Sequence, residues 1–412
     1  MTKRQTNRSQ LWALGLGGFL VNADNRAISP MLPAIAMALH TSTSTAGLLV
    51  TAYSIPYGLF QLIYGPIADR IGKVTTILAS LCLFAIGTVI CGAVHTFASL
   101  LILRVITGMF AAGIIPTTLA QIGDMFDLAE RPRAIAFFMS FSTTGQAMGI
   151  VIGGIVAQYV SYRVLFFILG VAALPTIFTM AKQRASAKAE AVGLEPSEST
   201  AVSAQATKAM SALSLKSRYQ TLLHSRRAWL VYSLVLCEGL VFYGGFTFLG
   251  VYGVTMLHAS YLTIGLLTAT YSLGAFLGSR TITAVLNRIG TPRMPIFGAG
   301  LMTLGFLAVW GVHSLIGLTL GLILLGFGFS YCHSTLQTYA TDLLPNGRAT
   351  AISLFAFSLF FGSGLGPMLS GQVLDAYGMR AMLLTIAVCM AAFGLVCCIV
   401  ANKAYRKSEG ST

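Results

Sequence analysis

Long apolar segments recur along the whole chain and restrict its fold more strongly than any other feature. Hydrophobic residues make up 56% of the 412 residues and charged residues only 9%, whereas soluble domains carry about 25% charged residues. A helix needs roughly 20 mostly apolar residues to cross the hydrocarbon core of a bilayer. Such segments lie at residues 11–39, 46–68, 74–95, 98–124, 132–159, 163–181, 227–256, 260–287, 293–313, 315–342, 347–376 and 379–402. We therefore predict an all-α membrane protein with twelve transmembrane helices in a lipid bilayer.

Basic residues are distributed unevenly between the loops. With an even number of spans, 21 of the 26 Lys and Arg residues fall in the tails and in the loops on one face, and only Arg163 and Arg380 fall on the other. Positive charge accumulates on the cytoplasmic side, so we predict a multi-pass protein of the cytoplasmic (inner) membrane with both termini in the cytoplasm. The formal charge of +14 then follows from topology. A nucleic-acid partner is not expected, since it would need basic residues clustered on a soluble face.

The two halves of the chain resemble each other. Four landmarks recur with nearly the same offset in residue number: Arg70-Ile71-Gly72 and Arg288-Ile289-Gly290, Arg133-Ala134 and Arg348-Ala349, Arg163 and Arg380, and Asp24 and Glu238. Parallel repeats of this kind form two halves around an axis along the membrane normal, with a substrate site between them near the midplane. The polar stretch between the halves has the composition of a linker. We predict an N-terminal six-helix bundle at residues 1–181, a cytoplasmic linker at 182–226 and a C-terminal six-helix bundle at 227–412.

Sequence motifs of enzymes and of cofactor or metal sites are missing. The sequence has no G-x-x-x-x-G-K-[ST] loop for nucleotide phosphates, and neither H-E-x-x-H nor G-x-S-x-G. The seven cysteines all lie in apolar segments and lack metal-ligand spacing. We therefore expect neither an enzyme nor a cofactor nor a metal site.

The loop after the second apolar segment carries the most specific motif. It reads Gly65-Pro66-Ile67-Ala68-Asp69-Arg70-Ile71-Gly72-Lys73 and resembles motif A of the major facilitator superfamily, G-x-x-x-D-R-x-G-[RK], at the place where that family keeps it. An acidic residue at a helix end can cap a neighbouring helix or pair with a basic residue of the next loop. We assign a cytoplasmic gate to Gly65, Asp69, Arg70, Gly72 and Arg133. In the second half Asn287 stands where Asp69 stands in the first.

Two further motifs resemble the same superfamily. The run Arg104-Val105-Ile106-Thr107-Gly108 is similar to its motif B, in which an intramembrane Arg is tied to proton coupling. Motif C, the signature of its exporters, is matched by Gly145, Gly149, Gly153 and Gly154, although Ile150 stands where that motif has Pro. Small residues at this spacing also let two helices pack closely without a further role. We therefore class these four glycines as a helix-packing motif.

Ionisable residues inside the apolar segments are the main functional candidates. A charge at that depth costs about 2.5–3.5 kcal/mol on insertion scales and is retained mostly for function or for a buried pair. An acid there is disfavoured in its charged form and so can exchange protons. We assign proton coupling to Asp24 or Glu238, tuned by Arg104, with an ordinary buried pair to Arg as the alternative for Glu238. Glu238 shares a helix face with Phe242 and Phe246, which would suit a lipophilic or cationic solute.

The first apolar segment supports two interpretations. Asn22, Asn25 and Arg26 form one polar stripe, and Asp24 projects roughly 160 to 200° away from it, so Asp24 and Arg26 cannot both face a cavity on an ideal helix. The stretch from Asp24 to Pro33 resembles the first-helix motif of drug/proton antiporters, D-x-x-x-x-x-x-x-L-P, which implies that Asp24 couples protons. An Asp followed closely by Arg also resembles organic-anion carriers of the superfamily, which implies that Arg26 contacts an anion.

Polar and aromatic stripes on other segments complete the predicted substrate cavity. They are Tyr53, Tyr57 and Gln61 on the second segment and His333 and Gln337 on the tenth. Aromatic stripes in membrane helices more often serve packing, and a single interior His is more often hydrogen-bonded than a proton relay. The predicted cavity thus comprises Asn22, Asn25, Arg26, Tyr53, Tyr57, Gln61, Phe242, Phe246, His333 and Gln337.

The resemblance to the major facilitator superfamily covers residues 11–402. It implies two bundles that rock about a substrate site at the membrane midplane. Proteins of this fold usually work as monomers, so a monomer is expected. The favoured function is proton-coupled efflux of small lipophilic or cationic compounds, as in multidrug antiporters, so a small-molecule substrate and protons are the expected partners. The alternative is proton-coupled uptake of an organic anion or another small metabolite. A membrane receptor or a lipid scramblase is the remaining class.

Overall fold

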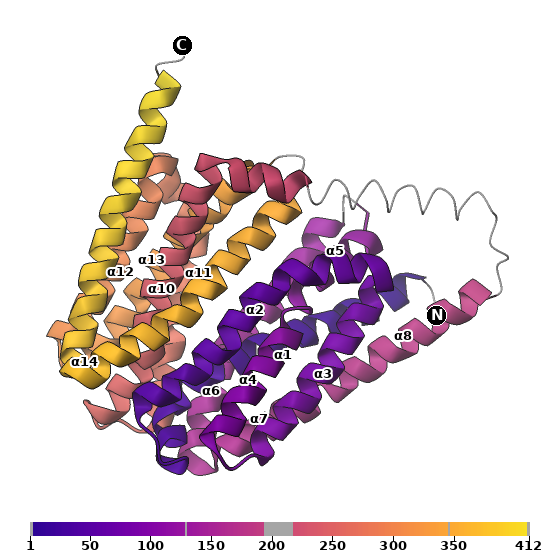
Figure 1. The fold of residues 1–412 in the computed structure, drawn as a ribbon, viewed down its shortest axis with the longest axis horizontal. Helices are drawn as coiled ribbons and strands as arrows, with labels where there is room; N and C mark the ends of the chain where they lie inside the picture. Colours follow the sequence, from indigo (N-terminus) through magenta and orange to yellow (C-terminus); the bar gives the residue numbers. More distant parts are fainter. Residues whose placement is uncertain (1–2, 128–129, 193–216, 345–346, 410–412) are drawn as a thin grey trace.

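The computed structural model describes residues 3–127, 130–192, 217–344 and 347–409, and these residues form helices joined by short turns (Figure 1). The helices are α1 (Lys3–Ala38), α2 (Thr43–Ile71), α3 (Lys73–Ala93), α4 (Phe97–Ala111), α5 (Ile115–Met125), α6 (Arg131–Tyr159), α7 (Tyr162–Ala172), α8 (Leu174–Val192), α10 (Arg226–Thr255), α11 (Tyr261–Ile289), the 3-10 turn η1 (Thr291–Arg293), α12 (Met294–Gly311), α13 (Leu315–Asp342) and α14 (Arg348–Glu409). No described residue lies in a strand. Ten spans in this part of the chain are long and apolar enough to cross a membrane, so the predicted all-α membrane class is confirmed.

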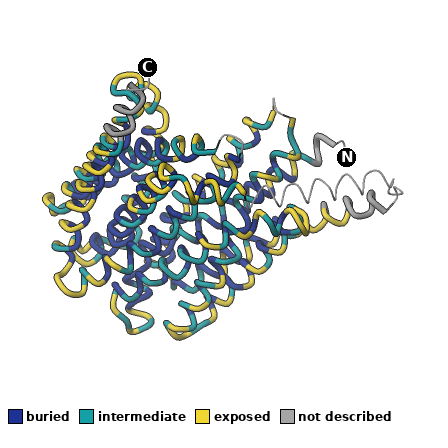
Figure 2. Tube along the Cα trace, turned by 45° about the horizontal axis from the view of Figure 1, so that its top comes forward, coloured by how far each residue is buried: buried dark blue, intermediate teal, exposed yellow. Residues whose placement is uncertain are grey.

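Many large apolar side chains of the described residues are exposed. Figure 2 shows that the buried residues gather between the helices and the exposed residues lie on their outer faces. Ile102, Phe178 and Ile316 are all more than half exposed. In water such a surface would drive aggregation, whereas in a bilayer it faces hydrocarbon, and the helical hydrogen bonds satisfy the backbone there. The chain is a multi-pass membrane protein.

Serine and threonine caps set the starts of six helices. In each of them the side-chain oxygen accepts a backbone N–H of the first turn, which would otherwise lack a partner. The capping residues are Ser42, Thr96, Ser161, Ser225, Ser260 and Ser314. Three other helices, α5, α6 and α12, carry Pro in the first turn, where its missing N–H has no consequence.

Several helix boundaries differ from the prediction. The segment 98–124 is interrupted between α4 and α5, where the backbone of Gly113 packs directly against the side chains of Tyr64 and Ser80. The segment 163–181 is divided into α7 and α8, and α8 continues to Val192, past the predicted start of the linker. The two last segments are joined in α14, which leaves helical geometry at Gly378 (φ 81°, ψ 173°). Hydropathy marks where a chain is apolar, but a helix continues beyond the bilayer wherever its backbone remains hydrogen-bonded.

Close backbone contacts between helices repeat in the two halves. A methyl group on Gly145, Gly149 or Gly153 of α6 would collide with the carbonyl oxygens of Phe19, Ala23 and Ala27 on α1. Similarly, a methyl group on Gly362 or Gly366 of α14 would collide with those of Leu236 and Leu240 on α10. Gly362 and Gly366 follow Gly145 and Gly149 by one constant difference in residue number. Leu236 and Leu240 follow Phe19 and Ala23 by the same difference, which is called here the repeat offset. We call these two contacts the glycine seams.

A second pair of contacts follows nearly the same register. Gly108 of α4 lies against the carbonyl of Tyr53 on α2, and Gly326 of α13 lies against that of Tyr271 on α11. Gly326 follows Gly108, and Tyr271 follows Tyr53, by one position more than the repeat offset. In the register of the seams Asp24 aligns with Val241 and not with Glu238. The alignment that suggested an equivalent pair of acids is therefore wrong by almost one helical turn, and the two acids occupy different places in their halves.

The helices of residues 3–192 and of residues 217–409, called here the first and second half, meet along α1 and α10, α2 and α14, and α6 and α11. Five pairs of described residues are hydrogen-bonded across the two halves: Arg26 to Tyr243, Ser29 to Thr247, Ser44 to Asp375, Thr51 to Gly364 and Tyr261 to Gln158. These bonds lie toward the end of the molecule that holds the turns after α1, α6 and α10, called here the closed end. From there the halves diverge toward the end that carries both termini, the open end (Figure 1).

Candidate functional site between the two halves

An ion pair is buried inside the first half, between α1 and α4. Arg104 Nη1 donates to Asp24 Oδ2 at 2.6 Å, and the two side chains are 1% and 0% exposed. The ring of Tyr53 covers the guanidinium at 4.2 Å. Asp24 Oδ1, Arg104 Nε and the Tyr53 hydroxyl are buried without a hydrogen-bond partner among the described residues. Charged side chains at membrane depth are rare and are retained mostly for function or for a buried pair.

A second buried acid lies in the other half, between α10 and α13. His333 Nδ1 is 3.1 Å from Glu238 Oε2, and the glutamate side chain is fully buried whereas that of His333 is 19% exposed. The ring of Phe329 stacks on the imidazole with 4.7 Å between centroids. The partner of Glu238 is thus a histidine and not the arginine of an ordinary buried ion pair.

Arg26 lies between the halves. Its Nη2 donates to the hydroxyl of Tyr243 on α10 at 2.7 Å, and its guanidinium lies 4.4 Å from the centre of the same ring. Tyr243 follows Arg26 by the repeat offset, so they are equivalent positions, and equivalent positions that touch must lie on the axis relating the halves. No described carboxylate pairs with Arg26. The structure thus directs Asp24 into the first half and Arg26 toward the second, in agreement with their predicted separation on the helix.

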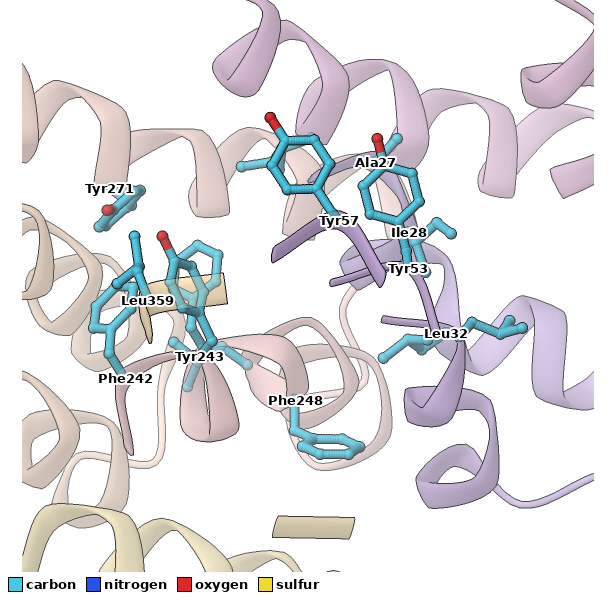
Figure 3. Packing of buried hydrophobic residues seen from close by; sticks show 14 of the residues in the cluster. Ala27, Ile28, Leu32, Tyr53, Tyr57, Phe242, Tyr243, Phe248, Tyr271 and Leu359 are labelled. Atoms are coloured by element: carbon cyan, nitrogen blue, oxygen red, sulfur yellow. The ribbon is translucent and has the colours of Figure 1, made fainter. Parts of the chain in front are cut away.

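An aromatic cluster of the second half adjoins Arg26 through Tyr243. Figure 3 shows Phe242, Tyr243 and Tyr271 of this cluster. Phe242 contacts Tyr243, Phe246, Tyr271 and Phe329, with ring centroids 4.6 to 5.7 Å apart. The sequence pattern identified only Phe242 and Phe246, because they share one helix face. Tyr271 and Phe329 come from α11 and α13, and their proximity depends on packing. For Tyr243 the sequence does hold a signal, namely its position one repeat offset after Arg26.

The remaining predicted cavity residues are distributed between the interface and the first half. The ring of Tyr57 packs against that of Phe360 in the second half, with 4.4 Å between the ring centroids. Gln61 is buried one turn further along α2. Asn22 instead donates to Ser142 of α6 at 2.6 Å, inside the first half, and Tyr53 covers the Asp24–Arg104 pair. Asn25 is half-buried, and Gln337 is exposed near the end of α13.

The residues assigned to the cytoplasmic gate lie at the open end. Gly72 ends α2 with a positive φ of 90°, and Lys73 pairs with Asp124 of α5. Asp69, Arg70 and Arg133 are exposed, and Asp69 has no hydrogen bond or ion pair to a described residue. The expected cap or ion pair of Asp69 is therefore not formed in this conformation. A side chain added at Gly65 would meet nothing within 4 Å.

Metal-binding groups do not converge in the described part of the chain. No three His, Cys, Asp or Glu side chains there are arranged to hold a metal ion, and all seven cysteines are free thiols.

Comparison with known families gives a match along nearly the whole chain. The model of the Major Facilitator Superfamily matches residues 14–262 and 255–412. YceJ of Bacillus subtilis (strain 168), described as an uncharacterized MFS-type transporter, is 27% identical and aligns over 88% of each chain. MdtD of Salmonella heidelberg (strain SL476), a protein named for multidrug resistance, is 26% identical and aligns over 92% of this chain and 89% of its own.

Solved structures of transporters share the fold. A bacterial homologue of the human lysosomal transporter Spinster, in an inward-facing and unoccupied conformation, superposes with a TM-score of 0.72 at 18% identity, covering 96% of this chain and 95% of the other. A POT peptide transporter superposes with a TM-score of 0.75 at 13% identity and 98% coverage of both chains.

Proposed function

Because the chain belongs to the major facilitator superfamily and is a transporter of that superfamily, we propose that it exports small lipophilic compounds in exchange for protons, by alternating access between two six-helix bundles. The observation that carries this proposal is the grouping of the hydrogen bonds between the halves at one end of the molecule. Such an arrangement is one of the two states that alternating access requires.

A count of twelve spans accounts best for the helices. Ten candidate spans are present, and the longest, Arg348–Val400, is broken at Gly378 and is long enough to cross twice. Helix α1 adds one more, because it is apolar on both sides of Asp24 and Arg26, which lower its hydropathy. The glycine seams support two bundles at residues 1–181 and 227–412, with 182–226 between them. Residues 193–216 lie outside the described residues.

The distribution of basic residues supports an orientation with both termini in the cytoplasm of the inner membrane. The open end then faces the cytoplasm and the closed end faces outward. In this orientation Gly65, Asp69, Arg70, Gly72 and Arg133 form the cytoplasmic gate. The carboxylate of Asp69, which has no partner among the described residues, belongs to the open state of that gate, and it would gain a partner when the gate closes.

Proton coupling is assigned to the Asp24–Arg104 pair. A proton on Asp24 removes the charge attraction that holds the carboxylate to Arg104, so the contact between α1 and α4 weakens and the first half can change its shape. Glu238 with His333 is the alternative site of proton exchange. The aromatic cluster beside them favours a lipophilic substrate, and the multidrug-resistance name of the MdtD relatives points the same way.

A second function, uptake of an organic anion together with protons, is favoured by Arg26. This guanidinium lies between the halves without a carboxylate partner among the described residues, whereas Asp24 and Glu238 each have a basic partner in their own half. An unpaired cation at membrane depth is retained mostly for a ligand, and the charge of that ligand would be negative.

Everted membrane vesicles with an acidic lumen and a pH-sensitive dye test the two functions. We expect ethidium, a lipophilic cation, to release lumenal protons in the wild type and not in Asp24→Asn, whereas the control Asp342→Asn, which changes an acid of α13 outside the site, behaves as wild type. If ethidium releases no protons, while right-side-out vesicles take up benzenesulfonate and Arg26→Ala abolishes that uptake, the export function is contradicted and the uptake function replaces it.

A further inference from the structure

Two polar contacts at the closed end occupy equivalent places in the halves. The side-chain oxygen of Gln158, near the end of α6, accepts the backbone N–H of Tyr261, the first residue of α11, at 3.0 Å. The carboxylate of Asp375 accepts the hydroxyl of Ser44, the second residue of α2, with 2.6 Å to each oxygen. Asp375 follows Gln158 by the repeat offset of the glycine seams. Each contact therefore joins one half, just before a helix ends or breaks, to the start of a helix in the other half.

The backbones are also in close contact at these two places. A methyl group on Gly154 would collide with the carbonyl of Tyr261, and one on Gly371 would lie 3.3 Å from the Ser44 side chain. These two glycines are again separated by the repeat offset. The geometry is thus repeated in both the side chains and the backbone, which distinguishes it from a chance surface contact.

The two contacts differ in charge. The start of a helix carries a partial positive charge, which attracts an anion such as the Asp375 carboxylate at α2. Gln158 offers α11 only a neutral amide oxygen. One contact is therefore a charged hydrogen bond and the other a neutral one, although the backbone around them is equivalent.

The place of these contacts at helix ends makes them sensitive to rocking of the halves. The contact of Arg26 with Tyr243 lies on the symmetry axis, near the middle of both helices, whereas Gln158 and Asp375 lie near helix ends on opposite flanks, between α6 and α11 and between α2 and α14. Rocking of the halves about a line in the membrane midplane moves the helix ends furthest, so both contacts must break whenever the closed end opens. The halves cannot exchange states without losing them.

We propose that Gln158 and Asp375 are positioning residues of the transport cycle, which hold the closed end shut and set the population of the state open at that end. The proposal rests on alternating access as the proposed function. It follows that the negative charge at these two contacts determines how often the closed end is open. A charge lost at one contact can then be replaced by a charge gained at the other. Asp375→Asn should weaken one contact, Gln158→Glu should strengthen the other, and the double variant should restore the wild-type balance.

Pulsed EPR distances in lipid nanodiscs measure this equilibrium. In a protein whose native cysteines are all replaced, spin labels at Ala38 and Tyr377 report on the Ser44–Asp375 flank, and labels at Val160 and Met256 on the Gln158–Tyr261 flank. A charge at a helix start changes the equilibrium by about two- to fivefold. We expect Asp375→Asn to raise the long-distance fraction by that factor and Gln158→Glu to lower it. Gln372→Ala, one turn before Asp375, is the matched control and should change nothing.

Cancellation in the double variant is the decisive result, because damage to the fold would add and not cancel. Unchanged distance fractions in both single variants, single variants that shift the fractions in the same direction, or a double variant that does not return to the wild-type fractions, overturn the proposal. The flux assay in vesicles judges the proposed function separately. If the protein shows proton-coupled flux but the variants leave the distance fractions unchanged, only the positioning roles of Gln158 and Asp375 are contradicted. If the single variants shift the fractions and the double variant restores them, but the protein shows no flux, the positioning roles are supported and the proposed transport is contradicted.

Discussion

The buried pair of Asp24 and Arg104 is the residue-level feature on which the proposed coupling depends. Its two charges are removed from water, so each is stable there only while the other remains. A proton that neutralises Asp24 therefore leaves the arginine without its counter-charge. The pair thus links the protonation state of one carboxyl group to the contact between α1 and α4.

A double-mutant cycle measures this dependence. Asp24→Asn and Arg104→Gln should each lower the melting temperature in detergent, because each leaves a buried charge unpaired. The double variant removes both charges, and we expect it to be more stable than the sum of the single losses predicts, with a coupling of about 0.5–3 kcal/mol. Additive losses would show that the two side chains do not stabilise each other.

At this scale the sequence predicted the direction of side chains on a single helix better than it predicted their partners on other helices. Helical periodicity separated Asp24 from Arg26, because side-chain direction along one helix follows from spacing alone. The partners, Arg104 on α4 and Tyr243 on α10, depend on which helices are neighbours. The sequence favours an ordinary hydrogen-bonded role for His333, and its partner Glu238, 95 residues away, could not be identified from either helix separately.

The helices are held together by glycine seams, which bring backbones into contact at two equivalent places. The glycines predicted on α6 do form a packing contact, and Ile150 in place of Pro did not prevent it. What the sequence did not show was the partner helix. The interruptions of α4–α5 and α7–α8 were also missed, because they follow from tertiary contacts such as that of Gly113 with Tyr64 and not from composition.

Substitutions in the seams should be damaging in both halves. Gly149→Val and Gly366→Val each place a branched side chain against a carbonyl of the neighbouring helix, and we expect each to reduce the free energy of unfolding by about 1–3 kcal/mol. Gly300→Val on α12 is the matched control, because nothing lies within 4 Å of its Cβ position. Melting temperatures in detergent compare the three. Equal stability of all three proteins would contradict the conclusion that the glycine seams stabilise the fold.

Gly65 on α2 should behave differently, because it has open space in this conformation. We expect Gly65→Val to leave the melting temperature nearly unchanged but to reduce transport, since the gate must close around this position in the other state. A collision of about 1–3 kcal/mol there would reduce the closed-gate population by roughly 5- to 150-fold. Undiminished transport by a stable Gly65→Val protein would remove Gly65 from the gate.

The whole molecule is held in one conformation by contacts at one end, while Asp69, Arg70 and Arg133 of the predicted gate form no hydrogen bond to a described residue of the other half. Composition, repeat spacing and the distribution of basic residues are properties of the entire chain, and they sufficed to predict the fold class. The conformation was not predictable in this way, because both states of a transporter must be compatible with the same sequence and differ by only a few kcal/mol.

Alternating access is tested most directly by measuring both ends of the molecule in one experiment. Spin labels at Ile71 and Ala349 report on the open end, and those at Ala38 and Tyr377 on the closed end. On changing the pH or adding substrate, we expect the long distance at one end to be replaced by a short one while the other end changes in the opposite sense. Two ends that lengthen together, or that stay fixed while substrate is transported, would contradict the account.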